Sequence, residues 1–85
     1  MKEKVEIKTY YWPNGNRCGE TPYVNGKIHG LKTWWYVDGS MWHETPYVNG
    51  RIHGLERGWY ENGNNRYETP YKKDQQHGAS IDFNY

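Results

Sequence analysis

The sequence Glu-Thr-Pro-Tyr occurs three times, beginning at Glu20, Glu44 and Glu68, so the chain repeats itself every 24 residues without insertion or deletion. The copies extend further, because residues 23–31 and 47–55 both read Tyr-Val-Asn-Gly-[Lys/Arg]-Ile-His-Gly-Leu. A fixed period of this length is typical of an array of supersecondary units, each of which buries apolar surface only against its neighbours. The repeat therefore constrains the fold more than any other feature.

We expect a single domain over residues 1–85, built from these repeats alone. It comprises a half repeat at 4–15, repeats at 16–39 and 40–63, and a C-terminal capping repeat at 64–85, in which the pattern decays. A chain of this length buries only about 60 to 65% of its unfolded surface, so we expect no sizeable apolar core. Aromatic residues nevertheless make up 18% of the chain, and we expect rings to supply most of the burial.

Asn-Gly and Asp-Gly pairs divide the chain at alternating intervals of 11 and 13 residues. These pairs are the strongest short-range hairpin signal, because type I′ turns need a positive φ at both central residues. The series predicts an all-β fold: a single-layer antiparallel meander of stacked hairpins with about seven strands, elongated and twisted. The pairs begin at Asn14, Asn25, Asp38, Asn49 and Asn62, and Lys73-Asp74 occupies the next place.

Two-residue loops at every turn would fix the register of the strands. Across the Asp38-Gly39 turn, Val37 would face Ser40, Trp35 would face Trp42, and Thr33 would face Glu44. Across the next turn, Trp42 would face Arg57.

This register divides the apolar residues between two faces. We expect the first face to be the packed one, because aliphatic and aromatic ladders fill it better. It carries Ile7, Tyr11, Cys18, Val24, Leu31, Trp35, Trp42, Val48, Leu55, Trp59, Ile81 and Phe83. The second face carries Tyr10, Trp12, Tyr23, Ile28, Trp34, Tyr36, Met41, Tyr47, Ile52, Tyr60, Tyr67 and Tyr71.

A column of histidines precedes a column of mid-strand glycines, and evenly spaced His and Glu residues invite a metal-site or acid–base interpretation. Equivalent positions in successive repeats lie two strands apart, about 10 Å at roughly 4.8 Å per strand, which is too far to share one zinc ion. Glycine within a strand often marks a bulge. We therefore assign structural roles to Gly30, Gly54, Gly78, His29, His53 and His77, and we expect no metal site.

Catalytic motifs are missing from the sequence. It contains no glycine-rich phosphate loop, no paired-cysteine motif and no nucleophile with a neighbouring base. We expect no catalytic residues, no cofactor and no enzymatic activity.

Charge and hydropathy exclude other classes. The formal net charge is +1 with both signs interspersed, which predicts no basic stripe for nucleic acid. The basic cluster that recognises acidic lipids is also missing, so we do not expect a membrane-lipid partner. No apolar segment reaches the roughly 18 residues of a membrane span and no signal-peptide core follows Met1, so we expect a cytoplasmic protein.

The motif Tyr-x-x-Gly-[Lys/Arg]-x-His-Gly, followed by aromatic-Tyr-x-[Asp/Asn]-Gly, resembles MORN repeats over roughly residues 11–78. The resemblance is strongest to the bacterial variant found in proteins labelled antitoxin-like. It implies an elongated single-layer sheet of stacked hairpins, associated with protein scaffolding, dimerisation and phospholipid headgroups. Thr-Pro-Tyr replaces the Gly-Glu-aromatic sequence of the eukaryotic form, which weakens the case for lipid binding.

Ring surface on a sheet too thin to bury it favours a protein-binding role, because Trp, Tyr and Met are enriched in protein interfaces. We expect a module that occupies and neutralises a partner protein, as an antitoxin or a small phage or mobile-element inhibitor would. Scaffolding through a homodimer, phospholipid headgroup binding and carbohydrate stacking remain as alternatives. The expected partner-binding residues are Trp34, Tyr36, Met41, His43, Tyr47, Tyr60, Tyr67 and Tyr71.

Overall fold

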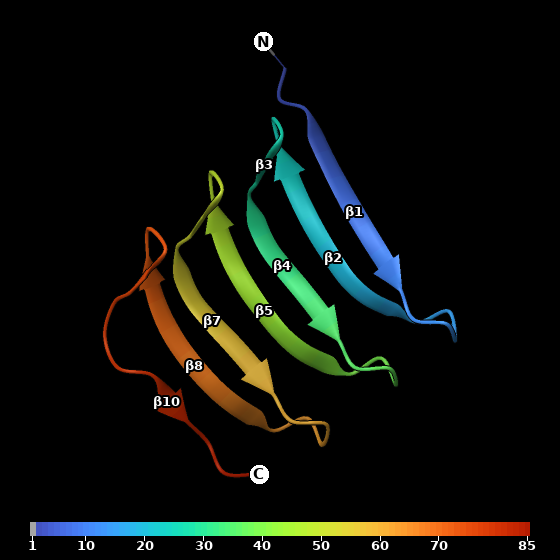
Figure 1. The fold of residues 1–85 in the computed structure, drawn as a ribbon, viewed down its shortest axis with the longest axis vertical. Helices are drawn as coiled ribbons and strands as arrows, with labels where there is room; N and C mark the ends of the chain where they lie inside the picture. Colours follow the sequence, from blue (N-terminus) through green and yellow to red (C-terminus); the bar gives the residue numbers. More distant parts are fainter. Residues whose placement is uncertain (1) are drawn as a thin grey trace.

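The computed structural model describes residues 2–85, which form one open antiparallel sheet without helices (Figure 1). Neighbouring strands follow chain order along the path β1-β2-β4-β5-β7-β8-β10, and three two-residue strands extend the hairpin tips. The predicted meander is confirmed. The strands are β1 (Val5–Tyr11), β2 (Arg17–Val24), β3 (Lys27–Ile28), β4 (Gly30–Trp35), β5 (Met41–Val48), β6 (Arg51–Ile52), β7 (Gly54–Trp59), β8 (Asn65–Lys72), β9 (Gln75–Gln76) and β10 (Ile81–Asp82).

Two kinds of turn alternate along the chain, at opposite ends of the sheet (Figure 1). At the end that we call the tip end, two-residue turns at 25–26, 49–50 and 73–74 place both central residues at positive φ, as type I′ requires. At the other end, the loop end, only the glycine has positive φ, and a main-chain hydrogen bond of 2.9 Å joins Gly39 N to Tyr36 O. These three-residue loops account for one of the two residues by which the turn spacings of 11 and 13 differ, and the other lies in the segment that contains the mid-strand glycine.

Each three-residue loop is followed by a bulge, which changes part of the predicted register. Thr33 faces Glu44 as predicted, but Trp35 faces Met41 rather than Trp42, because Trp42 is the extra residue of the bulge. Tyr36 N bonds to Ser40 O, which replaces the predicted pairing of Val37 with Ser40.

A second irregularity lies at the mid-strand glycines, as predicted. His53 N bonds to Pro46 O at 3.0 Å, Gly54 has a φ of 123°, and the register moves by two residues. Arg57 therefore faces Glu44, so the predicted pairing of Arg57 with Trp42 is wrong. A shift of two residues leaves each side chain on its original face.

The sheet is a slab one layer deep, with principal extents of 47 × 38 × 13 Å. Within residues 2–85, no apolar side chain is buried. Eleven of the twelve residues assigned to the second face are half-buried, against five of the twelve on the first. The prediction that the first face is the packed one is therefore wrong.

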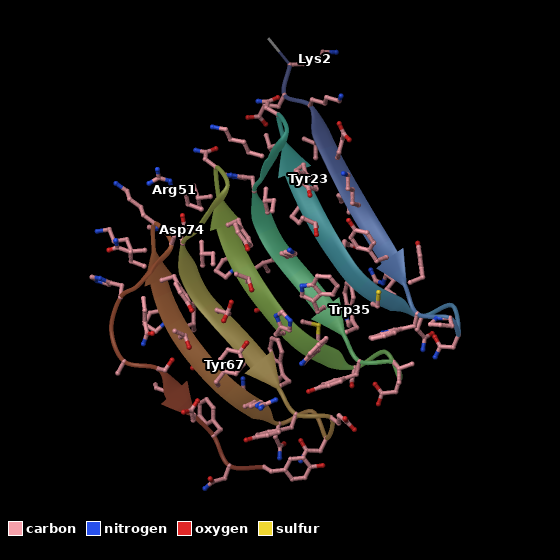
Figure 2. All side chains as sticks on the ribbon, viewed as in Figure 1. Lys2, Tyr23, Trp35, Arg51, Tyr67 and Asp74 are labelled. Carbon is pink, nitrogen blue, oxygen red and sulfur yellow. The ribbon has the colours of Figure 1, made fainter. Side chains whose placement is uncertain are left out.

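The second face is better covered because its rings lie across glycines on neighbouring strands. A methyl group built on Gly19 would come within 2.6 Å of the Trp34 ring, and one built on Gly58 would overlap the ring of Tyr67. Figure 2 shows Tyr67 where β7 and β8 run side by side. The glycines thus provide space that the large rings fill.

Side chains and turns join each unit to the next at both ends of the sheet. At the loop end, Trp12 Nε1, Tyr36 Oη and Tyr60 Oη donate to main-chain carbonyls 23 residues further along, at 3.1, 2.7 and 2.8 Å. At the tip end, Gly50 N donates to Ile28 O and Asp74 N donates to Ile52 O, at 2.8 and 2.9 Å. Each repeat is therefore held by its immediate neighbours.

We predict that Gly58→Ala destabilises the protein by about 1–3 kcal/mol, because the added methyl group overlaps the Tyr67 ring. Urea unfolding gives the free energy of unfolding. The Tyr67→Ala background removes the overlap, so Gly58→Ala should cost much less there. Equal costs in the two backgrounds would show that the ring does not need the space above Gly58.

We predict that Tyr36→Phe lowers the free energy of unfolding by about 0.5–1.5 kcal/mol, because the hydroxyl loses its bond to Trp59 O. Tyr11→Phe is the matched control, since the Tyr11 side chain is exposed and its hydroxyl makes no hydrogen bond within residues 2–85. An equal effect of the two substitutions in urea unfolding would contradict a linking role for Tyr36.

Candidate functional site

The candidate site is the aromatic face, which we define as Tyr10, Tyr23, Trp34, His43, Tyr47, Tyr67 and Tyr71. The strand pairings place these residues on one face in two rows that cross the strands. Between the rows lie the three most buried side chains, Thr21, Thr45 and Thr69, which are 3 to 6% exposed. These threonines, which the sequence analysis did not single out, form the centre of the face.

The middle of the face is a cluster of rings around His43. The Trp34 ring stacks between Tyr10 and His43, with centroid distances of 6.4 and 6.2 Å. Trp42 meets His43 edge-on at 5.0 Å and stacks on Tyr36 at 5.7 Å. Trp42 was assigned to the first face, but its position in the bulge brings its ring against two residues of the second.

Two opposite charges lie near this cluster, which makes the face mixed rather than purely apolar. The Lys32 ammonium lies 5.5 Å from the Trp34 ring centroid, and the Glu56 carboxylate accepts a 2.8 Å hydrogen bond from Thr45 Oγ1. Burial, and then the negative charge of Glu56, raise the pKa of Tyr67. The Tyr67 hydroxyl therefore stays neutral beside the Glu56 carboxylate.

The predicted partner-binding residues divide into two groups. Trp34, His43, Tyr47, Tyr67 and Tyr71 belong to the aromatic face, where all five are half-buried. Tyr36 and Tyr60 use their hydroxyls to link neighbouring repeats, and Met41 lies opposite Trp35 beside the bulge. Only the first group lies together on one continuous surface.

The predicted structural positions hold the bulges mainly through the main chain. Gly30, Gly54 and Gly78 have φ values of 109 to 123°, and the N–H of each preceding histidine bonds to a proline carbonyl. Of the three imidazoles, His29 Nδ1 accepts a 3.2 Å hydrogen bond from Asn49 N. Within residues 2–85, His53 and His77 make no side-chain hydrogen bond, so the predicted imidazole role is met only by His29.

Residues 2–85 contain neither a cluster of metal-ligating side chains nor a membrane-spanning helix. No three His, Cys, Asp or Glu side chains in this range lie close enough together to hold a metal ion. The same residues contain no helix long and apolar enough to cross a membrane.

His43 is a titratable group at the centre of the aromatic face, and its pKa lies below the ordinary value. Its Nδ1 is buried and has no hydrogen-bond partner within residues 2–85. Burial lowers the pKa of His43, Glu56 opposes this effect, and Lys32 adds to it. Because the unfolded chain binds this proton more tightly, His43 favours unfolding as the pH falls below about 6.5.

We predict that His43→Phe reduces the loss of stability on acidification. The free energy of unfolding should fall less between about pH 7.5 and about pH 5.5 in the variant than in the wild type, because the phenyl ring keeps the stacking but cannot be protonated. His43→Gln should also reduce the fall in the free energy of unfolding between the two pH values, because glutamine is polar but is not protonated in this range. An unchanged pH dependence in both variants would show that His43 does not carry the effect.

Comparison with known proteins supports the architecture. Residues 7–25 and 52–73 match a family described as a MORN repeat variant. No curated protein and no solved structure matches the chain. MORN repeats are generally non-catalytic binding modules. The two matched segments contain most of β1 with all of β2, and all of β7 and β8, so the chain is similar to MORN repeats in these two hairpins. They include Tyr10, Tyr23, Tyr67 and Tyr71 of the aromatic face, whereas Trp34, His43 and Tyr47 lie outside them.

Proposed function

We propose that this protein is a non-catalytic binding module that holds a protein partner on its aromatic face. It acts by occupying the partner's surface, as an antitoxin-like protein or a small inhibitor would. The observation that carries the proposal is the single-layer sheet: no second layer covers Trp34, Tyr47, Tyr67 and Tyr71, which remain partly exposed. Rings of this kind, with a polar end, are enriched in the centres of protein interfaces.

The composition of the face favours a protein over a small molecule. The rings stand on a flat sheet, and none of the hollows found in residues 2–85 is lined by Trp34, Tyr47, Tyr67 or Tyr71. Small ligands bind in concave sites that bury most of their surface, whereas protein partners bind flat surfaces. The mixture of rings with Lys32 and Glu56 provides both apolar contact and fixed charges for orientation.

The test is affinity capture from the native host with quantitative mass spectrometry. The double variant Tyr47→Ala and Tyr71→Ala removes two rings of the aromatic face, from residues that pair with Gly30 and Gly54 in the neighbouring strand. We predict that it loses the captured partner by about tenfold or more, because truncation of central interface aromatics typically costs 2 kcal/mol or more.

The matched control lies on the opposite face. Ile7 and Leu31 are 59 and 51% exposed there and lie away from the tip end, so Ile7→Ala with Leu31→Ala should leave capture unchanged. Circular dichroism confirms that both variants are folded. Loss of the partner only in the control would place binding on the opposite face and refute the proposal.

A further inference from the structure

The tip end of the sheet gathers positive charge. The 24-residue period places Lys27 and Arg51 at equivalent positions on two hairpin tips. The third tip has Gln75 at this position and carries Lys72 and Lys73 instead, and the three tips lie beside one another in the sheet (Figures 1 and 2). Interspersed charges in the sequence predicted no basic stripe, and for this end of the sheet that prediction is wrong. Among the ion pairs found in residues 2–85, none involves these four cations.

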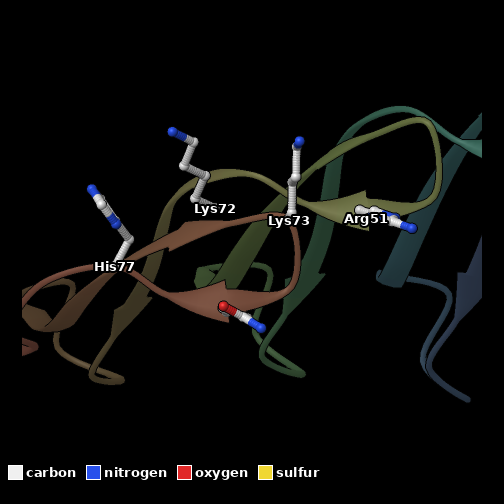
Figure 3. Close-up of a pocket in the computed structure, with 5 residues that line it drawn as sticks. Arg51, Lys72, Lys73 and His77 are labelled. Atoms are coloured by element: carbon white, nitrogen blue, oxygen red, sulfur yellow. The ribbon is translucent and has the colours of Figure 1, made fainter.

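Two adjoining hollows separate the tips. One, of about 320 Å³, is lined by Arg51, Lys72, Lys73, Gln75 and His77 (Figure 3). The other, of about 400 Å³, is lined by Lys27, Val48, Asn49, Arg51, His53 and Lys73. They share Arg51 and Lys73, and no carboxylate lines either of them.

The nearest acidic groups do not occupy these hollows. The Asp74 carboxylate accepts a 2.8 Å hydrogen bond from Ile52 N and so ties its own tip to the preceding repeat. Glu3 lines a separate hollow beside the first tip, together with Lys27 and His29. The uncompensated charge is therefore confined to the two hollows around Arg51.

The arrangement of donors points to several spaced carboxylates rather than to one phosphate. Phosphate sites usually combine converging main-chain N–H groups. Here the turn N–H groups of Asn49, Gly50 and Asp74 already bond to the preceding repeat. The remaining donors are long side chains spread along an edge, and the exposed side chain of Val48 adds an apolar contact between them.

The spacing of the tips matches an extended peptide. Successive tips lie two strands apart, which is about 10 Å. An extended peptide in the polyproline II conformation has three residues per turn and rises about 3.1 Å per residue, so every third side chain lies on the same side, about 9.3 Å from the last. A carboxylate at every third residue would therefore meet one tip after another.

We propose that the tip end binds an extended acidic segment of a protein, with carboxylates about three residues apart and an apolar side chain against Val48. This surface lies at the strand ends, beyond the row of Tyr23, Tyr47 and Tyr71, and no residue of the aromatic face lines either hollow. The inference does not depend on the proposed function, and the two can fail separately.

The probe is a fluorescein-labelled peptide of four Glu-Val-Gly units, measured by fluorescence anisotropy against the full chain. We expect saturable binding that weakens as salt rises from about 50 to about 300 mM, because the contacts are exposed charges. The same peptide with Gln in place of Glu should bind at least about tenfold more weakly, since it lacks the charges that complement the tips.

Variants localise the site. Arg51→Glu with Lys72→Glu should weaken peptide binding about tenfold or more, because like charges then face the peptide. Lys8→Glu with Arg66→Glu is the matched control, since it changes the net charge equally but lies away from both hollows and should keep most of the affinity. The milder Arg51→Gln should weaken binding in the same direction, which guards against misfolding of the double variant.

Three results would overturn the proposal. The first is equal binding of the Glu and Gln peptides, and the second is equal weakening of peptide binding by the tip-end and control variants. The third is that the peptide does not bind, whereas phosphatidylserine vesicles, inorganic phosphate or a single-stranded oligonucleotide does. Tyr47→Ala with Tyr71→Ala should leave peptide binding unchanged, so loss of the partner on the aromatic face and loss of the peptide on the tip end are distinguishable.

Discussion

Residues 2–85 form a sheet one layer deep, so burial must come from side chains that lie over their own neighbours. The rings of Trp34 and Tyr67 do this by extending across Gly19 and Gly58, where any other residue would obstruct them. The threonines between the rows become the most buried side chains, while no apolar side chain of residues 2–85 is buried. A thin protein of this kind is stabilised by the cooperation of many half-buried rings rather than by a core.

The same constraint divides the aromatic residues by task. Tyr36 and Tyr60 lie at the loop end, where their hydroxyls reach the next repeat and complete main-chain hydrogen bonding that the ladder leaves open. Tyr47 and Tyr71 lie nearer the tip end on the aromatic face, and within residues 2–85 their hydroxyls make no such link. Tyrosines at the loop end therefore link neighbouring repeats, whereas tyrosines nearer the tip end remain partly exposed on the aromatic face.

Four features could be predicted from the sequence, because they follow from local rules. They are the period, the positions of the turns, the bulges at the mid-strand glycines, and the face to which most strand residues belong. The face assignment survived the wrong pairing of Arg57 because the error was two residues, an even number. The position of Trp42 could not be predicted, since the same Asp-Gly pair forms either a two-residue or a three-residue loop. The sequence analysis chose the wrong face as the packed one, because burial on this sheet depends on rings that lie across glycines of the neighbouring strand. The correct register would have shown that Gly19 pairs with Trp34.

The repeat affects the two proposed surfaces differently. On the aromatic face the equivalent positions of successive repeats carry Tyr10, Trp34, Gly58 and Asp82, so only one place offers Trp34 beside His43 and Tyr67. At the tip end Lys27 and Arg51 are equivalent, and Lys72 with Lys73 continues the series on the next tip. A periodic row, whether of charges or of Tyr23, Tyr47 and Tyr71, tolerates shifts of a ligand by one repeat. The aperiodic row of Tyr10, Trp34, His43 and Tyr67 does not. The aromatic face is therefore suited to specific recognition, and the tip end to attraction and orientation of a charged segment.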